Sequence, residues 1–359
     1  MANLDATQWL DLQSTNTTSD SRYAELGVLD AVKASTPATS EYIRPSDAAN
    51  LSSMSNLRDL QLPVIKEYTP TVVTTPGFSM IPSNLQETDQ YTFVAYDVFS
   101  GMRHYPASFR NNAVDEQFAI KENMRRISYE MGKTVESILL SNLSARKSQV
   151  LANTTQVSFG TGTYSFNTGT DTLEINKAAQ DETMFYSLEG LMASNELGGN
   201  YRIVTNRAGL ARQKAEIAKY GMYNSKNIEN LGFFDPSRMH ESASISAGSD
   251  IFNGYLLRDG SIGVYENFPY DFAMGTNFAG KTWSVSDTEI ENVKMRCNIY
   301  VNNEATDATS IITTGNDINL KMTHFQETAI WARFYVVYRY NSSIGTRAQD
   351  IVKIQGLAS

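Results

Sequence analysis

The residue types that carry most protein chemistry are few in this sequence and lie far apart. The three histidines are His104, His240 and His324, and their spacing fits no metal-binding motif. The single cysteine, Cys297, lies in the alternating segment MRCNIYV, which is typical of a small buried side chain rather than of a nucleophile. We therefore expect no catalytic residue, no metal ion and no cofactor.

The glycine-rich and acidic segments also give no evidence of a catalytic or phosphate-binding site. Residues 159–170, FGTGTYSFNTGT, lack the lysine that follows the glycines of a P-loop, so a β-turn region is the better interpretation. No G-x-S-x-G motif for a nucleophile elbow occurs. Asp181 and Glu182 lie where a helix would begin, and acidic residues are common there because the helix dipole stabilises negative charge. They need no catalytic role. An enzyme with a split active site is the alternative that these observations leave open.

Composition narrows the class of protein. The chain has 359 residues, is 41% hydrophobic and carries a net charge of −9 without a visible basic stripe. A protein that binds the phosphates of nucleic acid directly usually shows such a stripe, so we expect no sequence-specific binding of nucleic acid. The first residues have no basic region followed by an apolar run, and no apolar segment approaches the roughly 18 residues of a membrane span. We therefore expect synthesis in the cytoplasm and no membrane partner.

The elements around these residues are more informative, and the first is a long helix. Residues 115–150 contain no proline, and Ile120, Met124, Ile127 and Met131 begin an apolar stripe with spacings of three and four. A helix of this length would span about 50 Å. Three interpretations of this helix are open: a core helix of a large α+β enzyme, a coiled coil, and a structural rod against which copies of the chain stack.

Charged residues on this helix have two interpretations. They are Arg125, Arg126, Glu130, Lys133 and Glu136. They form either a solvated face or a set of pairs between neighbouring subunits, and exposed pairs contribute less than about 1 kcal/mol each.

Two segments before the helix have no core of their own. Residues 1–55 are rich in Ser, Thr, Asn and Asp, which predicts a mobile arm. Residues 57–80 and 89–106 predict a long two-stranded tongue with its turn at Pro82, Ser83 and Asn84. An isolated hairpin is marginal in water, so we expect the tongue to lie on a partner. Its apolar residues Val72, Val73 and Phe78 are predicted to contact an adjacent subunit.

The rest of the chain mixes helices and strands, which predicts an α+β fold. YRIVT (201–205) is a predicted buried strand, and Asn206 is predicted to cap the helix that follows it. Residues 254–272 predict a hairpin with Asp259 and Gly260 at its turn. The segment that ends in WARFYVVYRY predicts a strand buried on most of both faces.

This order of parts resembles the major capsid protein of tailed bacteriophages, with the Hong Kong 97-type capsid fold. The segments that carry the resemblance are YRIVTNRAGLARQKA, LLRDGSIGVYENF and AIWARFYVVYRYNSSIGTRAQDIVKI. The resemblance implies an N-terminal arm (1–55), an extended β-hairpin loop (56–110), a peripheral domain with the spine helix (111–180), an axial α/β domain (181–320) and closing strands shared by both domains (321–359).

The resemblance also implies a function. Copies of the chain would assemble as hexamers and pentamers into an icosahedral virion shell that encloses double-stranded DNA, and assembly would take place in the host cytoplasm. The extended loop would lie over a neighbour's spine helix. The resemblance also allows scaffold, portal and decoration proteins as further partners. Some family members form a Lys–Asn cross-link, but Lys66, the only lysine of the loop, lies away from its tip, so we expect none.

Two other shell or virion functions are alternatives. An encapsulin-like nanocompartment uses the same fold, although such chains are usually shorter and lack a long polar arm. Tail tube and baseplate proteins favour all-β architectures, and the long helix argues against them.

Overall fold

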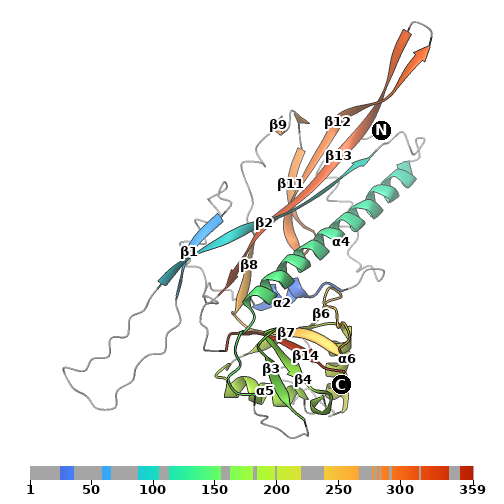
Figure 1. The fold of residues 1–359 in the computed structure, drawn as a ribbon. Helices are drawn as coiled ribbons and strands as arrows, with labels where there is room; N and C mark the ends of the chain where they lie inside the picture. The colour runs from blue at the N-terminus through green and yellow to red at the C-terminus, as the bar shows by residue number, and fades with distance from the viewer. Residues whose placement is uncertain are drawn as a thin grey trace, which may run out of the picture.

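The computed structural model describes residues 25–35, 59–65, 88–104, 113–154, 162–180, 184–198, 200–219, 238–266, 277–278, 281–282, 284–290, 293–314, 317–338 and 348–358. The chain contains both helices and strands, and all described elements after α6 are strands, which confirms the predicted α+β class. Figure 1 shows an elongated sheet with a long helix beside it, above a smaller layer of strands and helices.

The elongated first sheet is antiparallel throughout and has the strand order β1-β2-β13-β12-β11, with β8 also paired to β13. Its strands are β1 (Asp59–Ile65), β2 (Thr88–His104), β8 (Ile262–Glu266), β11 (Ser284–Ile290), β12 (Met295–Thr314) and β13 (Asp317–Tyr338). The C-terminal half of β13 is buried on both faces, as its continuous apolar sequence predicted. Two short strands, β9 (Asn277–Phe278) and β10 (Lys281–Thr282), pair with each other.

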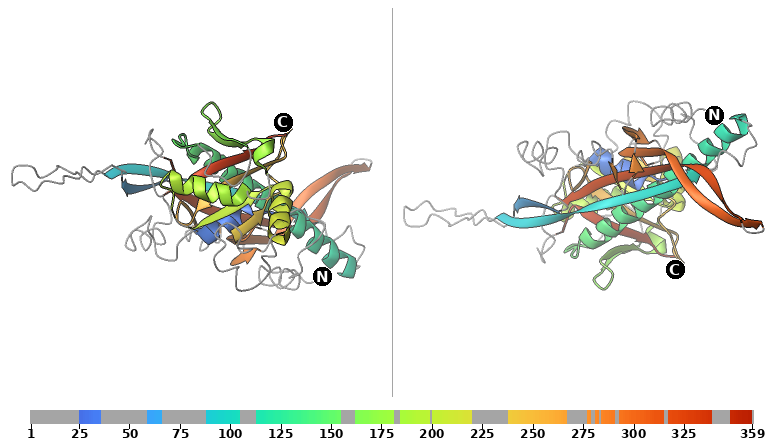
Figure 2. Two further views of the ribbon diagram at one scale, coloured as in Figure 1. Left: turned by 90° about the horizontal axis from the view of Figure 1, so that it is seen from below. Right: turned by 90° about the horizontal axis from the view of Figure 1, so that it is seen from above.

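Two two-stranded ribbons leave this sheet. In the first, β1 pairs with residues 88–94 of β2, which is the described part of the predicted tongue. Residues 95–104 of β2 were also predicted to belong to it, but they pair with β13 and belong to the sheet. The predicted turn at Pro82, Ser83 and Asn84 lies outside the described residues. In the second, residues 305–314 of β12 pair with residues 317–325 of β13. Figures 1 and 2 show the two ribbons at opposite ends of the molecule. The sequence did not predict the second one.

Helix α4 (Ala113–Arg146) is the predicted long helix, and it runs beside β2 along the first sheet (Figure 1). Its predicted apolar stripe is buried: Ile120, Met124, Met131, Val135 and Leu139 are all at most 3% exposed. At 1.5 Å per residue its 34 residues extend over about 50 Å.

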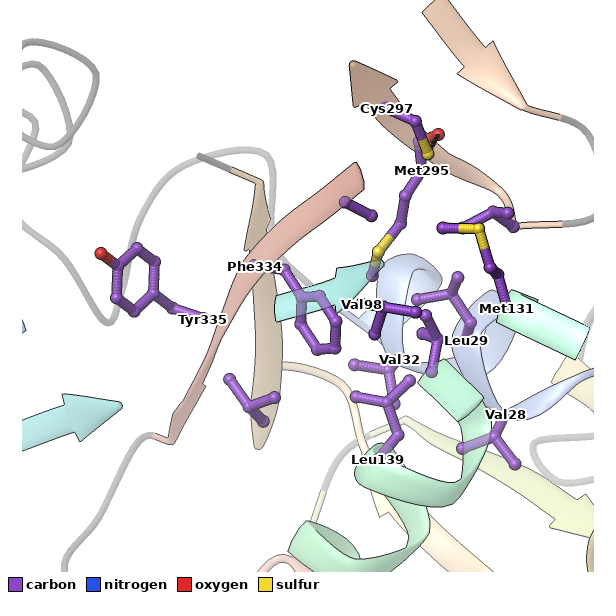
Figure 3. Packing of buried hydrophobic residues seen from close by; sticks show 14 of the residues in the cluster. Val28, Leu29, Val32, Val98, Met131, Leu139, Met295, Cys297, Phe334 and Tyr335 are labelled. Atoms are coloured by element: carbon purple, nitrogen blue, oxygen red, sulfur yellow. Dashed lines mark hydrogen bonds between the residues drawn. The ribbon is translucent and has the colours of Figure 1, made fainter. Parts of the chain in front are cut away.

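Helix α2 (Val28–Ser35) corrects the prediction of a mobile arm for this part of residues 1–55. Its apolar residues Val28, Leu29 and Val32 are at most 3% exposed. Figure 3 shows Leu29 beside Met131 and Val32 beside Leu139 of α4, and Val28 belongs to the same core. A helix of only two turns would not be stable alone, so its order comes from this packing.

The second sheet is mixed and has the order β3-β4-β14-β7-β5-β6. Its elements are β3 (Tyr164–Asn167), β4 (Thr172–Ile175), β5 (Tyr201–Thr205), β6 (Met239–Glu241), β7 (Phe252–Arg258) and β14 (Ile351–Gly356), with the 3-10 turn η2 (Lys177–Ala179) and helices α5 (Met184–Ser194) and α6 (Arg207–Lys219). The predicted strand 201–205 is confirmed as β5. The Asn206 side chain accepts a hydrogen bond from the Gly209 backbone N–H (3.1 Å), which confirms the predicted cap of α6.

Residues of the second sheet alternate between two apolar cores. Ile203, Leu256, Val352 and Ile354 pack with α5 in a core of their own. Their neighbours Val204, Leu257 and Ile351 belong instead to the core that contains α2, α4 and the first sheet. Since successive side chains of a strand point to opposite faces, the sheet separates the two cores.

The predicted hairpin at residues 254–272 is wrong. The turn itself is present, because the Ser261 N–H donates to the Arg258 carbonyl (3.0 Å) and Gly260 has a φ of 87°. However, β7 before the turn belongs to the second sheet and β8 after it to the first. Within residues 181–320, β11 and β12 lie in the first sheet, and the predicted domain boundaries stay a prediction.

Candidate functional site

The candidate functional site is helix α4 with the sheet surface around it, because the predicted contact residues lie there. Two polar contacts fasten the ends of α4 to the first sheet. Near its start, Glu116 Oε1 lies 2.9 Å from Nε2 of the buried His104, the last residue of β2. Near its end, the side-chain oxygen Oδ1 of Asn142 accepts hydrogen bonds from the hydroxyls of Tyr96 (3.2 Å) and Tyr338.

The second of these contacts is reinforced by a cation. The Arg146 guanidinium lies 4.8 Å above the Tyr338 ring. Burial raises the pKa of the Tyr338 hydroxyl, so this phenol is neutral at neutral pH, and burial lowers the pKa of Arg146. The two fastening points are 26 residues apart, about 39 Å along the helix, so the apolar stripe and these ends hold α4 as one straight rod.

Four of the five predicted charged residues form pairs within the helix. Glu122 lies between Arg125 (3.9 Å) and Arg126 (3.5 Å), and Lys133 lies 3.0 Å from Glu130. The Arg126 side chain is 67% exposed and the Glu130 side chain 66%, so these pairs contribute little to folding. Arg126, Glu130 and Lys133 are solvated, whereas the Glu122 and Arg125 side chains are only 17% and 23% exposed. Pairing of these charges with another subunit stays a prediction.

Glu136 differs from the prediction. It is 1% exposed, so it belongs neither to a solvated face nor to a surface that another copy could reach. Its carboxylate accepts hydrogen bonds from the Val28 backbone N–H (2.7 Å) and the Ser242 hydroxyl (2.6 Å). Glu136 was grouped with the other charged residues of the helix because the segments that bury it, α2 and the residues after β6, are distant in sequence and no local pattern predicts their contact.

The face of the first sheet that carries Asp97 holds a cluster that the sequence did not predict. Asp97 on β2 receives two hydrogen bonds from Arg333 on β13 (2.6 and 2.9 Å) and one from the Trp331 indole (2.8 Å). Arg333 is 8% exposed and also lies 4.8 Å above the Trp331 ring. Beside them Phe99, paired in register with Trp331, is 66% exposed. This cluster fixes β2 against β13 and leaves an aromatic ring at the surface.

The remaining candidate residues have no common site. Val72, Val73 and Phe78 lie outside the described residues. Cys297 is buried, as predicted, and burial raises the pKa of its thiol to about 12. Within the part of the chain that the structure describes, no group of three or more metal-ligating side chains is found. Nor does a helix in that part have the length and apolar character to span a membrane.

Comparison with known proteins gives matches only among solved structures. No family model matches the sequence, and no curated protein does. A chain of Microbacterium phage Oxtober96 is 12% identical, covers 99% of this chain and 100% of its own, and has a TM-score of 0.47. A chain of Mycobacterium phage Cain is also 12% identical, covers 100% of both chains, and has a TM-score of 0.46.

More distant structures match as well. A chain from the capsid structure of the cyanophage P-SCSP1u is 9% identical over 85% of both chains, with a TM-score of 0.41. A virus-like particle from Pyrococcus furiosus is 7% identical, covers 86% of this chain and 96% of its own, and has a TM-score of 0.36. These TM-scores all lie below 0.5, so the function has to be argued from the geometry of this chain.

Proposed function

We propose that this chain is the major capsid protein of a tailed bacteriophage, a structural subunit without enzymatic activity that assembles with copies of itself into an icosahedral shell. The observation that carries the proposal is the pair of ribbons at opposite ends of the first sheet. Among the described residues, β1 pairs with β2 alone, and the 305–314 and 317–325 segments pair only with each other. A two-stranded ribbon is at best marginally stable in water, so both ribbons need a surface on which to lie.

The rest of the geometry supports a rigid building block. Helix α4 is fastened at both ends, at His104 and at Asn142, and buries one stripe along its length. Its other face carries alternating charges that are open to solvent at Arg126 and Glu130. A straight rod with a charged outer face is suited to fix the register of a neighbour, because weak pairs repeated over many subunits add up.

The finer assembly follows from the same proposal. Hexamers and pentamers would form the shell, the first ribbon of one subunit would lie over α4 of the next, and Val72, Val73 and Phe78 would bury against that neighbour. The exposed residues Arg126, Glu130 and Lys133, and the partly buried Arg125, would pair between subunits. The acidic chain would enclose DNA without sequence-specific binding, and scaffold, portal and decoration proteins would be its further partners.

The proposal is tested by expressing the chain and examining it by light scattering and negative-stain microscopy. We expect closed particles or rings of five and six. Phe78→Asp should leave a soluble, folded subunit that assembles poorly, whereas Thr170→Asp, an equal charge change at an exposed turn of the second sheet, should assemble normally. Intact shells in normal yield from the Phe78 variant would contradict the predicted contact.

An encapsulin-like compartment is the second candidate, and the particles themselves distinguish it. Shells that package double-stranded DNA support the virion function, and shells that retain an enzyme and no DNA support the compartment. A chain that stays monomeric, both alone and with the structural proteins encoded beside it, would contradict both.

A further inference from the structure

A buried carboxylate lies where three parts of the chain meet. Glu136 is in the middle of α4, and its Oε1 accepts the backbone N–H of Val28, the first residue of α2, at 2.7 Å. Its Oε2 accepts the hydroxyl of Ser242, the residue after β6, at 2.6 Å. The carboxylate therefore caps α2 and also links it to the second sheet. The apolar side chains around the junction include Val28, Leu29 and Met131 (Figure 3).

The charged groups near Glu136 in the described part of the chain have partners of their own. Lys294, in the turn between β11 and β12, pairs with Asp30 of α2 and donates to the Leu26 carbonyl (3.1 Å). On β6, burial lowers the pKa of His240, so this ring is neutral at pH 7, and Glu241 adds a further acidic group. Among the described residues, no ion pair to Glu136 is found, and the positive charge of Lys294 favours its ionised form.

We propose that Glu136 is a proton-binding switch that sets how firmly α2 is held between α4 and the second sheet. The hydroxyl of Ser242 makes both protonation states compatible with the fold. When Glu136 is ionised, this hydroxyl donates to Oε2. When Oε2 carries a proton, the hydroxyl can accept it, while Oε1 still accepts the Val28 N–H. This inference rests on the junction alone and does not depend on the proposed assembly.

The direction of the switch follows from the burial of the carboxylate. Burial raises the pKa of Glu136 above 4.5, and the hydrogen bonds from Ser242, Val28 and Ser244 oppose that shift without cancelling it. The folded chain thus holds this proton more tightly than the unfolded chain does. The stabilisation is complete below pH 4.5 and is lost as the pH rises from 4.5 to the pKa of the folded state. Mild acid should tighten the docking of α2, and neutral pH should loosen it.

Hydrogen exchange of the full-length chain, followed by mass spectrometry from pH 4.5 to 7.5, tests the switch. After correction for the intrinsic pH dependence of exchange, peptides that cover residues 25–35 should exchange several-fold faster at the upper end of this range. Glu136→Gln imitates the protonated acid, because its amide can donate to Ser242 and accept from Val28. This variant should show the slow exchange of the acid form at every pH. Glu130→Gln, which removes an exposed carboxylate from the same helix, should retain the wild-type profile.

Two outcomes would overturn the proposal. One is a Glu136→Gln variant that keeps the wild-type pH dependence in these peptides. The other comes from Ser242→Ala, which serves where the Gln variant does not fold. Loss of a hydrogen bond to the anion should move the midpoint of the exchange transition to higher pH, and an unchanged or lower midpoint would show that another group titrates.

Discussion

Leu139 offers the sharpest test of how α4 is anchored. Its side chain is fully buried, and it lies in one core with Val32 of α2, Val98 of β2 and Phe334 of β13 (Figure 3). Replacement of a buried leucine by alanine costs about 2–5 kcal/mol, and the cost is greater where the surroundings cannot collapse into the cavity. The residues around the cavity that Leu139→Ala would leave belong to three different elements, which cannot easily move together to fill it. We therefore expect this variant to lower the free energy of unfolding by about 3–4 kcal/mol.

Urea unfolding of the unassembled chain, at a concentration where light scattering detects no particles, would measure this loss. Ser141→Ala changes an exposed residue of the same helix and should stay within about 0.5 kcal/mol of the unaltered chain. Val32→Ala and the double variant complete a cycle, and contact across the α2–α4 interface predicts a coupling of at least about 0.5 kcal/mol. A Leu139→Ala loss below about 1 kcal/mol, or no coupling, would refute the packing described for this core.

Three further changes test other parts of the structure. A Cβ at Gly254 would lie 2.5 Å from the Val204 carbonyl oxygen, so Gly254→Ala should destabilise by about 1–3 kcal/mol in urea, whereas Gly198→Ala, with open space around it, should not. The Cys297 thiol, with a pKa of about 12, should react about a thousandfold more slowly with a thiol reagent at pH 8 than the unfolded chain does, and equal rates would contradict its burial. Asp97→Asn removes the charge that pairs with the buried Arg333 guanidinium. Because Asp97 itself is 40% exposed, the cost should be below that of a fully buried pair, about 1–2 kcal/mol of unfolding free energy. A loss smaller than about 0.5 kcal/mol would contradict a structural role for the pair.

Local periodicity predicted several of the regular elements of the fold. The three- and four-residue spacing from Ile120 to Leu139 gave the length of α4 and its buried face, because both depend on residues within a few turns of each other. The apolar run of β13 likewise predicted a strand covered on both faces. Asn206 predicted the start of α6 for the same local reason.

Contacts between distant segments were beyond such patterns. Asp259 and Gly260 have the sequence of a hairpin turn, yet the strands on either side of them pair in different sheets, and that choice depends on β13 and β14 more than 70 residues later. Glu136 has the spacing of a solvated charge, and its burial depends on Val28 and Ser242, each more than 100 residues away. Sequence alone therefore predicted the charged face of α4 but not which of its carboxylates is internal.

The small helix α2 has more influence on the fold than its eight residues suggest. Before it, Gly27 lies so close to β6 that a Cβ would be 2.2 Å from the Glu241 carbonyl oxygen, and the Ala243 N–H donates to the Glu25 carbonyl (3.0 Å). At its end, the Ser35 carbonyl accepts the Gly260 N–H (2.8 Å) at the turn where the chain crosses between the sheets.

These contacts join α2 by its backbone to the second sheet, while its apolar side chains pack against α4 and the first. Since two turns of helix have almost no stability of their own, α2 is ordered only while both neighbours hold it. A change in the charge of Glu136 therefore acts on an element that contacts both layers.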